Sequence, residues 1–203
     1  VATVALKDRS HPAIVALRPD SRRASTVVHG ADPSDVSMPV TRTRLDGYRD
    51  APNFEGVLAG VRDLLRRGDE FQRARAVLAA TELRDRAALP ALVELLGTRP
   101  PELAADAQRA LVEITKQDLG TSERQWRAWI ADNEDVPRTR WLIDGLRSQD
   151  EHIRKGAQAE LNKLTGQFFG YRFDANRAER DSGLQAWNDW WVGQARDAPG
   201  RWP

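Results

Sequence analysis

The residues that could do acid–base or metal chemistry in this chain are few and scattered. Its 203 residues include three histidines, His11, His29 and His152, and no cysteine. No two histidines stand three or four positions apart, the spacing that presents two metal ligands on one helix face, and no carboxylate cluster accompanies them. The sequence therefore predicts no metal site, no disulfide and no thiolate nucleophile.

The glycine-containing segments offer neither a phosphate loop nor a nucleophile. Gly166 and Gly170 lie in LTGQFFG, and the chain lacks the GxxxxGK[ST], GxGxxG and GxSxG patterns. We therefore expect no cofactor and no intrinsic catalysis. The two glycines are more simply explained as a helix end and a turn.

Arginines are densest between residues 62 and 86, where acidic residues are interleaved with them. The whole chain carries 31 basic and 30 acidic residues, a formal charge of +1. This balance favours solvated salt bridges over a phosphate-binding stripe. The arginines concerned are Arg62, Arg66, Arg67, Arg73, Arg75, Arg84 and Arg86.

An internal repeat is the strongest signal of fold. Residues 103–120 read LAADAQRALVEITKQDLG and residues 153–170 read IRKGAQAELNKLTGQFFG, an offset of fifty that aligns apolar residues at helical spacing. The same offset carries Leu92, Val93 and Leu96 onto Leu142, Ile143 and Leu146. Such self-similar helical units are typical of α-solenoids, in which each unit buries its apolar face against the next.

The apolar spacing predicts helices over 54–67, 70–83, 86–96, 102–116 and 151–165, and another that begins after Pro137. In the second of these we expect Phe71, Ala74, Val77 and Leu78 to point inward. Asp85 should cap the third, which contains Pro90, and Asp150 should cap the last.

A short tryptophan-bearing helix should follow each repeated segment. Ser122 would cap the first, with Trp126 and Trp129, and Ser182 the second, with Trp187, Trp190 and Trp191. Residues 171–181 would then be an inserted loop. We expect these tryptophans to be capping core rather than an interface.

The first 53 residues differ from the rest because five prolines at positions 12, 19, 33, 39 and 52 prevent long helices. Short runs with β-branched residues occur at 1–6, 13–17 and 25–28. We expect an extended arm over 1–53, a helical domain over 54–195 and a tail over 196–203 that holds Trp202. The arm should dock partly on a neighbouring subunit.

Paired helices with alanine at the close-packing position and leucine after it resemble bacterial HEAT repeats. The run LTGQFFGYR, followed by LQAWNDWW, is similar to a terminal unit of such proteins. The resemblance covers residues 54–195 and implies an all-α, HEAT-like α-solenoid of about three helical pairs, with Trp-rich short capping helices beside the extended non-helical arm. It also implies that the second helices line a concave, protein-binding face.

A non-catalytic scaffold, as a structural or adaptor subunit of a larger bacterial assembly, is the function that these features predict. Its partners would be other protein subunits, with no nucleic acid and no transmembrane segment, in the cytoplasm or, if Val1 follows a removed signal, in the periplasm. The outward positions of the second helices carry mixed charge: Glu102, Asp106, Arg109, Glu113 and Lys116 in the first, then His152, Lys155, Ala159 and Lys163 in the second. The expected partner-binding residues are Arg109, Glu113, His152, Lys155, Lys163 and Trp202.

Two alternatives belong to other functional classes. One is an enzyme on a HEAT-like scaffold, similar to a phycobilin lyase or an alkylpurine DNA glycosylase. The other is a nucleic-acid or membrane-surface binder that uses the arginines between 62 and 86.

Overall fold

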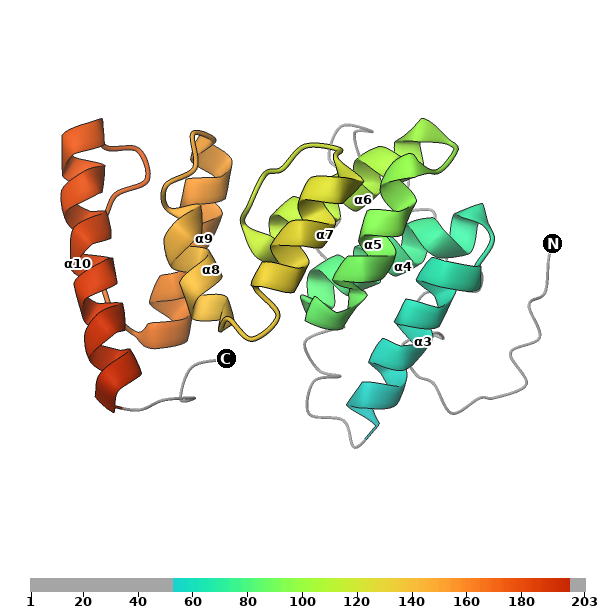
Figure 1. The fold of residues 1–203 in the computed structure, drawn as a ribbon, viewed down its shortest axis with the longest axis horizontal. Coiled ribbons are helices and arrows are strands. Elements are labelled where there is room, and N and C mark those ends of the chain that lie inside the picture. Colours follow the sequence, from blue (N-terminus) through green and yellow to red (C-terminus); the bar gives the residue numbers. More distant parts are fainter. Residues whose placement is uncertain (1–52, 198–203) are drawn as a thin grey trace, which may run out of the picture. The chain divides into compact units, whose positions relative to one another are not determined.

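In the computed structural model, residues 53–197 are described, with side chains to residue 194. They form eight α-helices and no strand (Figure 1), which confirms the all-α class for this part of the chain. The predicted arm and Trp202 lie outside the described residues. The chain divides into two compact units, Val1–Ala88 and Leu89–Pro203.

The first unit contains a helical hairpin of α3 (Phe54–Arg67) and α4 (Glu70–Leu83). The hairpin turns at Asp69, whose carboxylate accepts from the Gln72 N–H at 2.9 Å while the Gln72 side chain accepts from the Asp69 N–H at 2.9 Å. This capping box satisfies two amide groups at the start of α4. At the other end of the hairpin, Phe54 packs against the buried cluster of Val57, Leu58 and Leu83.

The predicted inward face of α4 is wrong at two positions. Phe71 and Leu78 are 63% and 64% exposed. The buried face instead consists of small and medium side chains, Ala76, Val77, Ala79, Ala80 and Leu83. Alanines allow close approach between helices, and this packing overrides the stripe of larger side chains.

The predicted helix over 86–96 is divided into three pieces. A 3₁₀ turn, η1 (Arg86–Ala88), precedes α5 (Leu89–Glu94), and a second 3₁₀ turn, η2 (Leu95–Gly97), follows it. Asp85 does cap the beginning, because its Oδ1 accepts from the Ala87 N–H at 3.1 Å. Pro90 stands in the first turn of α5, where a missing N–H removes no helical hydrogen bond.

The second unit contains two sets of three helices with matching contacts. In the first set α5 packs against α6 (Pro101–Thr115) and α7 (Glu123–Asp132). In the second set α8 (Arg138–Gly145) packs against α9 (Glu151–Thr165) and α10 (Arg177–Asp197), which Figure 1 shows beside one another. Contacts between α6 and α8 join the two sets.

The fifty-residue repeat extends to individual hydrogen bonds. Thr115 Oγ1 donates to the Leu111 carbonyl at 2.7 Å, and Thr165 Oγ1 donates to the Leu161 carbonyl at 2.8 Å. Each threonine oxygen also accepts from the backbone N–H two residues later, at 3.1 Å. Gly120 and Gly170 then turn the chain with φ angles of 61° and 71°, which favour glycine.

The helix α10 differs from its prediction because it begins at Arg177 and contains Ser182 in its interior. Asn176 takes the capping role: its Oδ1 accepts from the Glu179 N–H at 3.0 Å. The segment 177–181 is therefore helical rather than part of an inserted loop. The loop that remains, between α9 and α10, spans residues 166–176.

Tryptophan side chains form much of the core of the second unit. Trp126, Trp141 and Trp187 are at most 2% exposed, whereas Trp129, Trp190 and Trp191 are partly buried. The Trp187 ring meets Phe169 edge to face at a centroid distance of 4.8 Å. The structure thus places the predicted tryptophans in or against the core rather than on an open surface.

Candidate functional site

The predicted partner-binding residues lie on two helices of the second unit. Arg109 and Glu113 are exposed on α6, and His152, Lys155 and Lys163 are exposed on α9. Asp150 caps the start of α9, because its Oδ1 accepts from the His152 N–H at 2.7 Å. These positions are therefore available to a partner from the same helices that carry the repeat.

Lys116 was expected to point outward from α6 with these residues, and this prediction is wrong. Its side chain is only 4% exposed and its Nζ lies 2.6 Å from Glu113 Oε1. The residue ends α6 in a left-handed conformation with φ 58°, where the matching position of the second set holds Gly166 with φ 68°. The Lys116 side chain turns back toward the last turn of α6, where Glu113 lies.

Two glycines make room for the Lys116 side chain. A Cβ atom on Gly156 would lie 3.0 Å from Lys116 Nζ, and one on Gly145 would lie 2.9 Å from Lys116 Cβ. Because Gly156 belongs to α9, the Glu113–Lys116 ion pair at the end of α6 lies beside that helix. We call the exposed partner-binding candidates of the two helices the α6–α9 surface, which comprises Arg109, Glu113, His152, Lys155 and Lys163.

The α6–α9 surface carries charge of both signs, with Arg109 and Glu113 on α6 and with Lys155 and Lys163 on α9. Arg109 pairs with Asp106 one turn earlier on α6. On α9, Lys155 Nζ lies 5.5 Å from the centroid of the Phe173 ring, and no ion pair to Lys155 or Lys163 is found among the described residues. These two lysines can therefore meet an acidic group of a partner at little desolvation cost.

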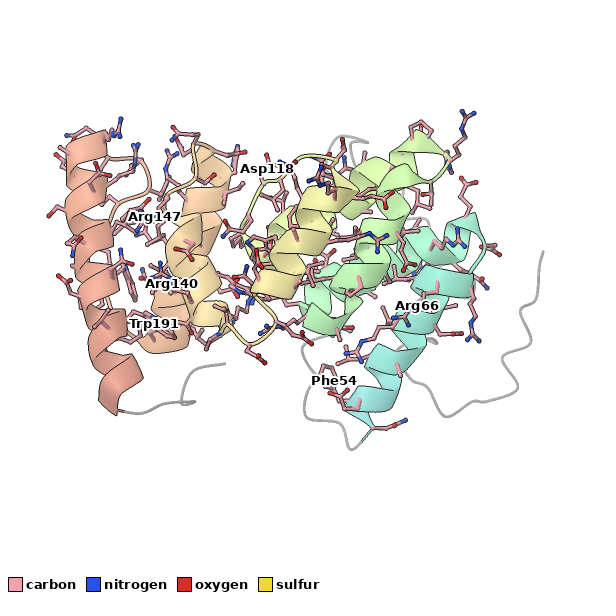
Figure 2. All side chains as sticks on the ribbon, in the orientation of Figure 1. Phe54, Arg66, Asp118, Arg140, Arg147 and Trp191 are labelled. Atoms are coloured by element: carbon pink, nitrogen blue, oxygen red, sulfur yellow. The ribbon has the colours of Figure 1, made fainter. Side chains whose placement is uncertain are left out.

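An open cavity of about 670 Å³ lies at the ends of α6 and α8 and the start of α9. Asp118, from the loop after α6, and Arg147, from the loop after α8, both line it (Figure 2). The other lining residues are Lys116, Gln117, Asp144, Ser148, Gln149 and Asp150. Sequence reasoning missed this cavity, because it depends on how the two loops meet.

The carboxylates of the cavity already have local partners. Asp144 accepts from Arg140 at 2.7 and 3.2 Å, and Asp118 Oδ1 accepts from the Gly120 N–H at 3.0 Å. Asp150 caps α9 as described above. Arg147 is the exposed cation of this lining, so the cavity can offer a guanidinium and several polar groups to a ligand.

Within the described residues, no group of three or more His, Asp or Glu side chains is placed to hold a metal ion. The same residues include no helix with the length and apolar character needed to cross a membrane. Of the histidines, His152 is exposed on α9, and His11 and His29 lie outside the described residues.

The arginines of the first unit are largely engaged in salt bridges and contacts within that unit. Arg62 forms two hydrogen bonds of 2.6 Å with the Asp85 carboxylate, and Arg67 pairs with Asp63 at 3.3 Å. The hydrogen bond to Asp85 and the charge of that carboxylate raise the pKa of Arg62, although burial opposes this. Arg73 donates to the Arg66 carbonyl, and Arg75 stacks on Phe71.

Sequence reasoning also missed Arg154 of α9, which is 6% exposed. Its guanidinium donates to the carbonyls of Phe173, Ser148 and Gln149 at 2.8 to 3.0 Å. It therefore joins the loops at both ends of α9 and positions the cavity wall. A basic residue next to Ile153 gives no sign of burial in the sequence, because its acceptors are backbone carbonyls whose directions the sequence does not reveal.

Comparison of the chain with protein-family models, curated proteins and solved structures finds no match.

Proposed function

We propose that this chain is a non-catalytic interaction scaffold, built as a HEAT-like α-solenoid and acting as a structural or adaptor subunit of a larger bacterial assembly. The observation that supports it is the repetition of a three-helix set with the same helix contacts and the same threonine hydrogen bonds. Repeated units that stack on one another build extended binding surfaces.

The α6–α9 surface is the part of the described chain that we assign to partner binding. Its polar, mixed charge suits a polar protein or peptide segment, with Lys155 and Lys163 facing acidic groups. The arm over residues 1–53 would supply a second contact with a neighbouring subunit, through main-chain hydrogen bonds of an extended segment.

Amine-reactive cross-linking of the native assembly tests this assignment, because the chain has only four lysines, Lys7, Lys116, Lys155 and Lys163. We expect cross-links from Lys155 and Lys163 to another protein, and none from the buried Lys116. The double variant Lys155→Glu, Lys163→Glu should lose the partner, whereas Lys155→Arg, Lys163→Arg should retain it. Partner binding that survives the charge reversal would contradict the α6–α9 surface as the binding face.

The basic-surface alternative predicts a different dependence on salt. A protein that binds phosphates through several arginines must lose affinity steeply as the salt concentration rises. Filter binding of DNA and sedimentation with anionic vesicles, each at 50 and 200 mM salt, would detect this. Tight, salt-sensitive binding that Arg66→Ala and Arg73→Ala abolish would favour the alternative over the scaffold.

A further inference from the structure

Helix α4 carries apolar side chains on two opposite faces. One face is buried within the fold by Ala76, Val77, Ala80 and Leu83. The other presents Phe71 and Leu78, which are 63% and 64% exposed. A helix that is apolar on both sides is normally covered on both sides.

The exposed face, which we call the α4 stripe, comprises Phe71, Ala74 and Leu78. Four large hydrophobic side chains are exposed among residues 53–194, and only these two share one helix face. Phe71 and Leu78 are two turns apart, about 10 Å along the helix. The partly buried Ala74 lies between them, so a small side chain separates two large ones and leaves a notch.

The chain that leads into α3 contains a segment that matches this notch. Residues 13–17 read AIVAL, the longest uninterrupted apolar run before Asn53. Pro12 and Pro19 flank the run and disfavour a helix through it, and the β-branched Ile14 and Val15 favour an extended backbone. Five extended residues span about 17 Å, enough to cover both turns of the stripe.

Side chains of an extended segment alternate, so residues 13, 15 and 17 point to one side. With Val15 over Ala74, the side chains of Ala13 and Leu17 would lie against Phe71 and Leu78. The segment joins α3 through residues 18–52, and the first turns of α3 lie near the end of α4, because Val57 and Leu58 share a buried cluster with Leu83. Attachment to the same molecule gives an effective concentration of about millimolar, which favours this segment over a second copy.

We propose that the α4 stripe is the docking site of residues 13–17 of the same chain. This inference goes beyond the proposed function, because it assigns one apolar run of the arm to its own first unit. The run at 1–6 is then the part of the arm that can reach a neighbouring subunit.

Engineered cysteines test the contact cleanly, because the full chain has none of its own. We expect the variant Val15→Cys, Ala74→Cys to form a disulfide within one molecule on mild oxidation, since a disulfide requires Cα atoms within about 7 Å. The control Val28→Cys, Ala74→Cys has a shorter tether but places the cysteine in another run. Its yield of intramolecular disulfide should be much lower.

A second pair of substitutions shows whether the stripe itself holds the segment. Adding Phe71→Ser and Leu78→Ser to the first variant should lower the disulfide yield to that of the control. Far-UV circular dichroism should stay unchanged, because both side chains are outside the buried face. Equal yields at positions 15 and 28, or a yield insensitive to the serines, would overturn the proposal. A disulfide-linked dimer as the main product in dilute solution would assign the stripe to a second copy instead.

Discussion

At the scale of a single residue, Asp85 has two roles in the first unit. Its carboxylate caps η1 through the Ala87 N–H and receives two hydrogen bonds of 2.6 Å from Arg62 on α3. Its side chain is 2% exposed, and that of Arg62 is 21% exposed. A buried carboxylate of this kind is tolerated because it is paired, and losing either partner leaves an uncompensated charge.

We expect Asp85→Ala to lower the free energy of unfolding by about 3 kcal/mol, at the lower end for a buried pair because water reaches part of Arg62. Urea denaturation followed by circular dichroism measures the change. Arg67→Ala is the matched control, since the Arg67–Asp63 pair is 81% and 57% exposed. It should change stability by less than about 1 kcal/mol. Equal effects of the two substitutions would contradict the role of burial.

Tyr171 anchors the loop before α10, because its hydroxyl donates to the Leu146 carbonyl at 2.6 Å and the residue is 1% exposed. Tyr171→Phe should destabilise the chain by about 1 to 2 kcal/mol, since the buried carbonyl loses its donor. Thermal denaturation at neutral pH measures this. An unchanged melting temperature would show that another donor replaces the hydroxyl.

The same residue predicts a dependence on alkaline pH. Burial raises the pKa of Tyr171, because desolvation disfavours the phenolate. The unfolded chain then releases this proton at lower pH than the folded chain, so the stabilising contribution is complete below pH about 10 and is lost as pH rises through the folded pKa. The wild type should lose stability above pH 10 more steeply than Tyr171→Phe. Parallel curves would contradict this linkage.

At the scale of an element, two glycines of α10 have opposite surroundings. A Cβ atom on Gly183 would lie 2.6 Å from Tyr171 Cα, whereas one on Gly193 would meet nothing within 4 Å. Alanine favours a helix over glycine by about 1 kcal/mol. Gly193→Ala should therefore stabilise the chain, and Gly183→Ala should destabilise it because backbone atoms must move. The measurement is the melting temperature of each variant. A shift in the same direction for both variants would contradict this account.

Trp187 of α10 provides a further test of the core. Trp187 is 1% exposed and meets Phe169 and Trp190 edge to face. Trp187→Ala should cost about 3 to 5 kcal/mol, as expected for truncation of a buried aromatic side chain. Urea denaturation of the variant measures this loss. An unchanged stability together with loss of partner binding would make the tryptophan an interface residue.

The sequence predicted elements well where one local signal dominated. The bounds of α9 follow from Asp150 at its start and Gly166 at its end. The start of α10 was wrong because two capping signals compete: Ser182 fits the register of the repeat, but Asn176 precedes residues that favour a helix. In α4 two apolar stripes compete, and only tertiary packing decides between Leu78 and Ala80.

The candidate site was predicted only in part for a related reason. Exposed positions of α6 and α9 follow from helical periodicity, so Arg109 and Lys163 were placed correctly on the surface. Lys116 was not, because its burial depends on space left by Gly145 and Gly156, which are distant along the chain. The cavity beside it depends equally on the meeting of two loops.

At the scale of the whole molecule, the two compact units differ in what their sequences leave exposed. The last helix of the second unit faces water with polar residues such as Glu179, Gln185 and Asp189. Each unit exposes two large hydrophobic side chains, but Phe168 and Val192 of the second unit stand on separate elements, whereas Phe71 and Leu78 of the first unit share one face of α4. This asymmetry is expected if residues before α3 complete the first unit, because exposed apolar faces promote association.

Removal of residues 1–52 tests this view of the whole chain. The truncated protein should stay helical, because α3 and α4 keep their capping box and their mutual packing. It should also associate in a concentration-dependent way, since the α4 stripe would lose its covering segment. Circular dichroism measures the helical content, and light scattering measures the association.

Phe71→Ser and Leu78→Ser should return the truncated protein to a monomer. The control Val192→Ser, at a residue of α10 that is 49% exposed, should not. A truncated protein that unfolds would place residues 1–52 in the core of the fold, and one that stays monomeric at high concentration would show that the stripe needs no cover.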